Sequence, residues 1–186
     1  VLFTEVEGFN EFMQVIAKSL VRDSYYGTIY RVTVGAVVST VDAVTDMYTI
    51  ITYYKSEELV GQANALIGMI ATNIIIQVLG VLVQYRKKGK LTRLKEILIT
   101  VIFLRPPVDA YRISKNHPDD EITFSRGLEL IGNKSVELAT ECIPGCVLQL
   151  FVWLTNPKKA GTFALVSIGV SALMTGYGSA LISFDM

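Results

Sequence analysis

Two long stretches without a charged residue constrain this chain more than any other feature. Residues 59–85 (LVGQANALIGMIATNIIIQVLGVLVQY) and residues 160–184 (AGTFALVSIGVSALMTGYGSALISF) contain no Asp, Glu, Lys or Arg. A helix rises about 1.5 Å per residue, so each stretch is longer than the hydrocarbon core of a bilayer, which is about 30 Å thick. We therefore expect both stretches to be transmembrane helices that cross with some tilt.

The composition of the whole chain agrees with a membrane protein. Hydrophobic residues make up 51% of the 186 residues, and the mean hydropathy is clearly positive, which excludes a disordered chain. The formal net charge is zero, so we expect no nucleic-acid partner. The chain begins at Val1 and ends directly after an apolar segment, and we expect it to be a piece of a longer protein. The predicted fold class is all-α, a polytopic transmembrane helical bundle forming one membrane domain over residues 1–186.

Three further segments complete the predicted bundle. Residues 29–54 have the length of a span and carry tyrosines near both ends, as in the aromatic belts at membrane surfaces. Residues 120–155 read as one long helix, kinked at Pro144-Gly145, whose second half enters the membrane as the segment 142–157. Residues 1–28 carry apolar side chains at helical spacing, which indicates an amphipathic lead-in helix.

Residues 91–114 do not fit a simple span. The apolar run 97–104 is too short to cross, and Arg105-Pro106-Pro107 interrupts the helical pattern. We expect a broken or re-entrant element, which is tolerated only where protein or water covers the freed backbone groups.

Small residues recur at packing distance along the two uncharged helices. This pattern lets helices approach closely in lipid, and we expect a compact bundle. The small residues are Gly61, Ala65, Gly68, Thr72, Gly169, Ala172, Gly176, Ala180 and Ser183.

Basic residues after the second span predict the orientation. The connector 86–96 carries an excess of Lys and Arg, which marks the cytoplasmic side, and two preceding crossings place the amino terminus there too. The sequence does not indicate which membrane is involved. Four of these residues, Arg86, Lys87, Lys88 and Lys90, can also contact anionic lipid head groups.

The span 29–54 contains two aspartates where lipid makes charge expensive. Asp42 and Asp46 are four residues apart and share one helix face. Each costs about 2.5–3.5 kcal/mol at the bilayer centre, and such residues usually serve a function. Buried charges can also pair simply to hold helices together, so both interpretations stand.

A second polar stripe follows the helix predicted over 120–155. Spacings of three, four, four and four place its members on one face, with Lys134 at the edge. Arg126 and Lys134 are candidate charge partners for acids three residues on, and Lys134 could also meet the aspartates. The stripe consists of Arg126, Glu129, Asn133, Glu137 and Glu141. We expect Asp42, Asp46, Glu129, Glu137 and Glu141 to line a path for a lipid head group or an ion.

Three motifs, in this order, resemble the XK-related family of membrane proteins. VDAVTDMYTIITYY is similar to that family's D-x-x-T-D helix, and FLRPPVDAYR to its short Arg- and Pro-bearing element. LELIGNKSVELATECIPGCVLQLFVWL is similar to its E-x-x-x-E-x-x-P-x-x-x-L-Q helix. The motifs cover roughly residues 33–154. The resemblance implies a multi-pass helical protein that scrambles phospholipids between leaflets. It also implies that Asp42, Asp46, Glu137 and Glu141 line or brace the route.

The sequence therefore leaves three functional hypotheses. The first is a scramblase-like protein whose partners are membrane lipids. The second is a cation or proton pathway through the acidic residues. The third is a non-catalytic structural subunit, associated with other membrane subunits.

Nothing in the sequence favours an enzyme. His117 is the only histidine, and no nucleophile or metal-ligand spacing accompanies it. The two cysteines, Cys142 and Cys146, read as small buried side chains in a reduced setting. We expect no catalytic residue, no metal site and no cofactor.

Overall fold

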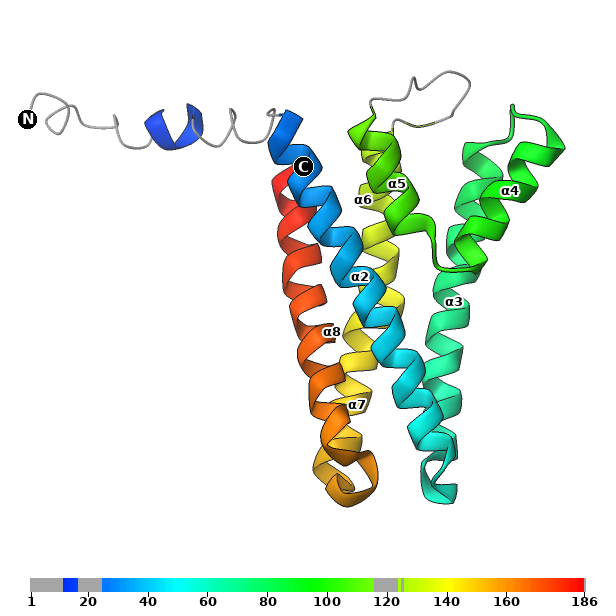
Figure 1. Ribbon diagram of the computed structural model, residues 1–186, viewed down its shortest axis with the longest axis vertical. Helices are drawn as coiled ribbons and strands as arrows, with labels where there is room; N and C mark the ends of the chain where they lie inside the picture. The colour runs from blue at the N-terminus through cyan, green and yellow to red at the C-terminus, as the bar shows by residue number, and fades with distance from the viewer. Residues whose placement is uncertain (1–11, 17–24, 116–123, 125, 186) are drawn as a thin grey trace, which may run out of the picture.

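The computed structural model describes residues 12–16, 25–115, 124 and 126–185, which form an elongated helical bundle without strands in that part of the chain (Figure 1). The all-α fold predicted from the sequence is confirmed. The helices are α2 (Tyr25–Tyr54), α3 (Val60–Gln84), α4 (Lys90–Val101), α5 (Arg105–Ser114), α6 (Arg126–Glu137), α7 (Ile143–Thr155) and α8 (Pro157–Asp185), with a 3₁₀ turn η1 (Glu57–Leu59) and a π-helical turn η2 (Leu138–Cys142).

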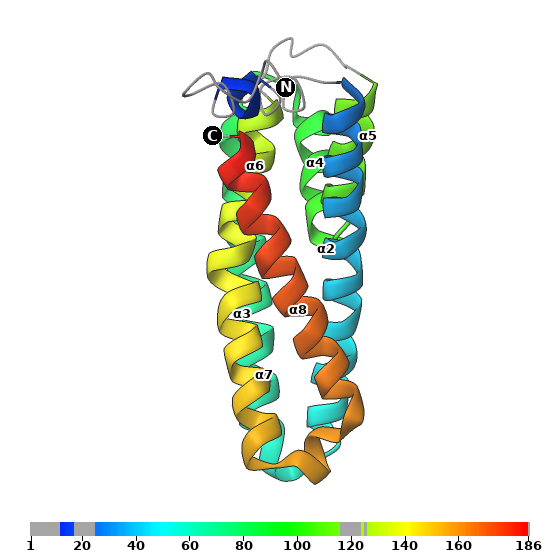
Figure 2. The same ribbon diagram turned by 90° about the vertical axis from the view of Figure 1, so that its left-hand side faces the viewer.

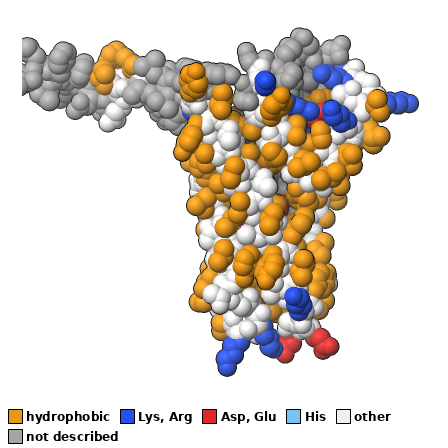
Figure 3. Space-filling model, viewed as in Figure 1, with side chains coloured by type: hydrophobic (Ala, Val, Ile, Leu, Met, Phe, Trp, Pro, Cys, Tyr) orange, Lys and Arg blue, Asp and Glu red, His pale blue; other side chains and the backbone are white. Residues whose placement is uncertain are grey.

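Four helical segments of the described chain are long and apolar enough to cross a membrane. They are Tyr26–Tyr54, Glu57–Gln84, Gly127–Thr155 and Pro157–Ser183. They run alternately down and up the bundle, so the start of α2, the α3–α4 turn and the end of α8 lie at one end (Figure 1). Charged side chains gather at the two ends, and hydrophobic side chains cover the length between them (Figure 3). The bundle therefore fits a multi-pass membrane protein.

The third span is longer than the predicted segment 142–157. It begins at Gly127, because α6, η2 and α7 form one continuous unit. The first half of this unit looks too polar for lipid by sequence. Lys134 and Glu137 are nevertheless buried inside the bundle, so the charges do not contact the lipid.

Helices α4 and α5 form the re-entrant element. α4 descends from the α3–α4 turn only part of the way, and α5 returns to the same end (Figure 1). The chain reverses at Phe103, which has a φ of 61°. Pro106 and Pro107 then occupy the first turn of α5, where a missing backbone N–H costs nothing.

The end of the bundle opposite the α3–α4 turn is closed by an apolar core. α8 packs along both α2 and α7 (Figure 2). The core combines large side chains with alanines, which let the helices approach closely. Its buried members are Ile50, Tyr53, Leu59, Ala63, Leu66, Ile70, Val152, Ala160 and Ala164.

The small-residue stripes do not lie in these helix contacts, and that prediction is wrong. Gly61, Gly68, Gly169 and Gly176 are exposed, and a Cβ added at any of them would meet no atom within 4 Å. Periodicity detects a face of small residues correctly, but it does not indicate which way that face points.

The predicted lead-in helix 1–28 falls largely outside the described residues. Within it, residues 12–16 are helical, and α2 already begins at Tyr25.

The contact between α8 and η2 gives a test of the packing. A Cβ on Gly178 would lie 3.2 Å from both Cδ atoms of Leu138. We expect Gly178→Val to lower the free energy of unfolding by about 1–3 kcal/mol through overpacking. Gly176→Val is the matched control, because it changes the same helix where space is open. Equal thermal unfolding temperatures for the two purified variants would contradict this packing.

Candidate functional site

Four carboxylates from two helical units meet inside the bundle. Asp42 and Asp46 project from α2, Glu137 ends α6, and Glu141 lies in η2. Their exposed fractions are 2%, 2%, 9% and 6%, so none of them faces the lipid. We call these four residues the acidic cluster.

Local sequence explains why Glu141 is buried in the cluster. A proline ring clashes with the carbonyl four residues earlier and supplies no N–H, which disrupts an α-helix. The helix accommodates Pro144 by widening into the π-helical turn Leu138–Cys142 just before it. Such turns often occur at functional sites. Here the turn carries Glu141 and Cys142 into the interior.

Side chains of α7, η2 and α8 donate hydrogen bonds to the aspartates. Asp42 accepts from Ser171 Oγ at 2.7 Å and from Cys142 Sγ at 3.5 Å. Asp46 accepts from Gln149 Nε2 at 2.7 Å and from Ser167 Oγ at 3.2 Å. The continuous α6–η2–α7 unit and α8 thus supply hydrogen-bond donors to the face of α2 that carries the two aspartates.

The glutamates have a separate set of partners. Glu137 accepts from Ser39 Oγ at 2.5 Å and from Lys134 Nζ at 2.7 Å. Glu141 accepts a hydrogen bond from Asn73 Nδ2, which joins α3 to the cluster. Lys134 forms its ion pair with Glu137 and none with the aspartates among the described residues. Of the four acids, only Glu137 has an ion pair among the described residues.

A small cavity borders the acidic cluster. Its volume is about 30 Å³, and its lining includes Asp42, Glu137, Glu141, Asn73 and Arg105. A water molecule needs about 10–15 Å³ of such space and several polar partners. The cavity is therefore of a size for water or a small ion.

A second set of charges lies toward the α3–α4 turn and holds α4, α5 and α6 together. Arg112 binds Glu96 through two hydrogen bonds of 2.5 and 2.8 Å, a strong bidentate arrangement. Arg105 contacts Asp109 at 3.4 Å and forms an ion pair with Glu129. We call these five residues the ion network.

The ion network contains three acids and two arginines. Burial raises the pKa of Asp109 to about 6, although Arg105 opposes the shift. The hydrogen bonds with Glu96 raise the pKa of Arg112 above its ordinary value. Protonation of Asp109 below about pH 6 would leave two carboxylates facing the two arginines.

The structure separates residues that the sequence analysis grouped. Glu129 belongs to the ion network and not to the acidic cluster. The side chain of Arg126 lies outside the described residues. Of the basic residues after α3, Arg86, Lys87 and Lys90 are exposed and Lys88 is half-buried. They lie at the end of the bundle where blue side chains gather in Figure 3.

Several polar partners were missed because each is uncharged. Asn73, Ser167 and Ser171 lie in stretches read only as lipid-spanning. Two sequence signals could have identified them. One is the amide of Asn73 among aliphatic residues, and the other is the spacing of four between Ser167 and Ser171. Arg105 was read as part of a helix break, yet it is buried and joins the ion network.

Comparison with models of protein families, with curated proteins and with solved structures gives no match to this chain. The described residues contain no group of three or more His, Cys, Asp and Glu side chains that could hold a metal ion.

The Lys134–Glu137 pair predicts a specific stability pattern. Lys134→Met leaves Glu137 as an uncompensated buried charge, which costs about 3–5 kcal/mol. Adding Glu137→Gln removes that charge, so we expect the double variant to recover most of the loss. Lys158→Met changes an exposed lysine and serves as control. Unfolding of purified protein measures the cycle, and additive losses in the double variant would contradict the pairing.

The raised pKa of Asp109 predicts how stability depends on pH. The folded-state pKa of about 6 exceeds the ordinary 3.8, so the unfolded chain ionises first as pH rises. Stability therefore falls between about pH 4 and pH 6 and stays lower above that range. The asparagine of the Asp109→Asn variant cannot ionise. We therefore expect the unfolding temperature of the variant to be several degrees above that of the parent at pH 7, and the two temperatures to converge near pH 4.

Thermal unfolding from pH 4 to pH 8 measures that difference. Glu57→Gln, at an exposed carboxylate, is the control. A difference between Asp109→Asn and the parent that does not change with pH would contradict the assignment.

Proposed function

We propose that this chain is a scramblase-like membrane protein. Phospholipid head groups pass between leaflets along the acidic cluster, while the acyl chains stay in the surrounding lipid. The observation that carries the proposal is the convergence of four buried carboxylates, from α2 and from the α6–η2 unit, inside an apolar bundle.

The energetic cost of the acidic cluster supports a functional role. Apolar residues of similar volume often stabilise a protein as well as a buried ion pair does, or better. Here one of the four acids, Glu137, pairs with a lysine, and serine, asparagine and glutamine side chains supply hydrogen bonds to the others. Polar groups aligned inside the bundle suit a cargo that is itself polar.

On this proposal, the route is closed in the conformation described here. A cavity of about 30 Å³ borders the cluster, which is far smaller than a phospholipid head group. The apolar core around Tyr53, Leu66 and Val152 blocks the other end of the bundle. Transport therefore requires helix movements that widen the cavity and part this core.

The resemblance to XK-related proteins supports the same function. The residues that carry it include Asp42, Asp46, Glu141 and Gln149. Although the two aspartates are distant in sequence from Glu141 and Gln149, all four residues lie together here. Gln149 donates a hydrogen bond to Asp46.

A cation or proton pathway is the second candidate. The observation that favours it is the excess of acids over cations beside a water-sized cavity. A current across a planar bilayer that depends on pH or voltage, and that Asp42→Asn with Asp46→Asn abolishes, would support this candidate.

Reconstitution into liposomes tests lipid scrambling. With a fluorescent phospholipid in both leaflets, we expect dithionite to bleach more signal than in protein-free vesicles. Asp42→Asn with Asp46→Asn should slow this at least tenfold, because the amides remove the charge that the route presents. Glu57→Gln with Glu58→Gln is the matched control, since both residues are exposed in the α2–α3 turn.

Bleaching equal to that of protein-free vesicles would contradict the proposal. Equal bleaching by parent and aspartate variant would show that scrambling does not use the acidic cluster. A folded parent that moves neither lipid nor ions, but co-purifies with a membrane partner, would favour the structural-subunit hypothesis.

A further inference from the structure

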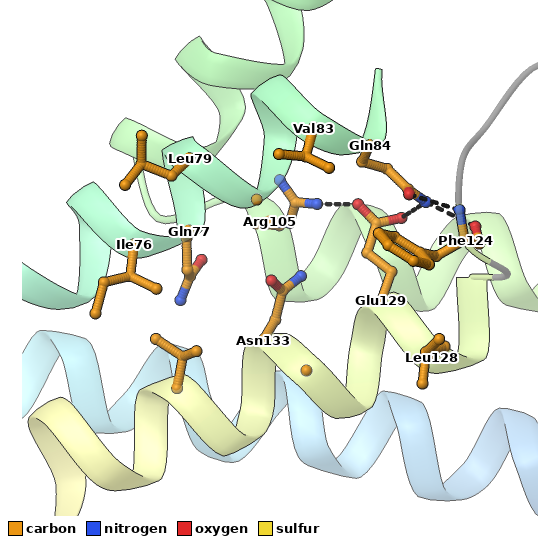
Figure 4. A pocket seen from close by; sticks show the side chains of 13 residues that line it. Ile76, Gln77, Leu79, Val83, Gln84, Arg105, Phe124, Leu128, Glu129 and Asn133 are labelled. Carbon is orange, nitrogen blue, oxygen red and sulfur yellow. Dashed lines mark hydrogen bonds and ion pairs between the residues drawn. The ribbon is translucent and has the colours of Figure 1, made fainter. Parts of the chain in front are cut away.

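A groove between α3 and α6 opens on the side of the bundle near the α3–α4 turn. Its volume is about 540 Å³, within the range of about 300–1,000 Å³ that is usual for small-molecule sites. Leu79 and Val83 line it from α3, and Leu128 and Val136 from α6. Figure 4 shows these two helices facing each other across the groove, with side chains directed into the space between them.

The length of the groove matches one leaflet. It extends along α3 from Ile76 to Gln84, which is about 12 Å at 1.5 Å per residue. Half of a hydrocarbon core of about 30 Å is about 15 Å. Beyond the groove α3 packs directly on α7, through Leu66, Ile70 and Val152. A helix of a partner protein that crosses the whole membrane would need a longer groove.

The floor of the groove offers a hydrogen-bond donor. The buried Nδ2 of Asn133 has no hydrogen-bond partner among the described residues, and Figure 4 shows the Asn133 side chain directed into the groove. A buried amide without a partner is costly. Asn133 as a whole is half-buried, so a rotation of its side chain would bring Nδ2 to an ester carbonyl of a lipid in the groove.

The two ends of the groove differ in polarity. At the end near the α3–α4 turn, Gln84 donates to the carbonyl of Phe124 at 2.8 Å and accepts from its N–H at 2.9 Å. Glu129 and Arg105 form their ion pair at this end (Figure 4). The turn that follows adds Arg86 and the lysines next to it. Ile76, Gln77 and Val136 line the opposite end, where no charged side chain is among the described lining residues.

We propose that the groove binds one glycerophospholipid of the leaflet on the α3–α4 side. One acyl chain lies between α3 and α6, an ester carbonyl accepts from Asn133, and the phosphate lies toward the basic α3–α4 turn. By the predicted orientation this is the cytoplasmic leaflet. The binding is an equilibrium property and does not require that the protein move lipid.

Photo-crosslinking in nanodiscs tests this site. The purified chain is placed in phosphatidylcholine discs doped with a phosphatidylcholine that carries a diazirine in its acyl chain. We expect crosslinks to residues 76–83 and 128–136 at least fivefold above those to exposed apolar faces elsewhere, such as Val44 and Val166. Even labelling of all exposed faces would overturn the proposal. A second set with anionic phosphatidylglycerol shows whether the basic turn selects the head group.

Glycine variants make the test specific. Gly132 and Gly80 line the groove, and a Cβ at either would meet no atom within 4 Å. Gly132→Leu and Gly80→Leu should therefore fold, occupy the groove and reduce crosslinking there at least fivefold. Gly68→Leu is the control, because it adds the same side chain to α3 outside the groove. Unchanged groove labelling in both folded variants would overturn the proposal.

The outcomes separate this site from the proposed function. If the chain binds lipid in the groove but does not scramble, the proposed lipid site is supported and the proposed function is contradicted. If the chain scrambles lipid but the crosslinks are evenly distributed, the proposed function is supported and the proposed lipid site is contradicted.

Discussion

The cost of placing carboxylates in a bundle surrounded by hydrocarbon governs the rest of this structure. Each such group must find donors within the protein, since the lipid offers none. The donors to Asp42, Asp46 and Glu141 come from α3, η2, α7 and α8. Satisfying four acids therefore brings together all the helices that span the bundle. In a medium where apolar burial gives no preference between helices and lipid, these polar contacts specify which faces turn inward.

The same requirement explains the re-entrant helices. Backbone that reverses direction at membrane depth persists only where protein covers it. The ion network supplies that cover, because Arg105 and Arg112 tie α5 to α6 and to α4. Arg105 also borders both the cavity of the acidic cluster and the α3–α6 groove. The hairpin thus borders both the α3–α6 groove and the cavity of the buried acids.

Sequence patterns predicted the two uncharged spanning helices and the break between α4 and α5. A stretch of 25 residues without charge favours a transmembrane helix, and two consecutive prolines interrupt a helix. The patterns did not predict which way a helix face points in the bundle. The stripe through Gly61 and Gly68 faces outward, and Glu129 joins the ion network instead of the aspartates. Spacing along one helix shows which residues share a face, but the partner of that face depends on how the helices pack. Uncharged donors such as Asn73 were missed because a single amide does not interrupt an apolar span.

Spin-label accessibility along α2 tests most directly whether the acids face the interior. Nitroxides are placed one at a time from Val37 to Thr49 in bilayers, and collisions with oxygen and with a water-soluble nickel complex are measured. The account predicts high oxygen access at Val37, Val41 and Val44, which are exposed, with a period of about 3.6 residues. Labels at Asp42 and Asp46 should be shielded from both reagents. A maximum of either signal at the aspartates would contradict the account.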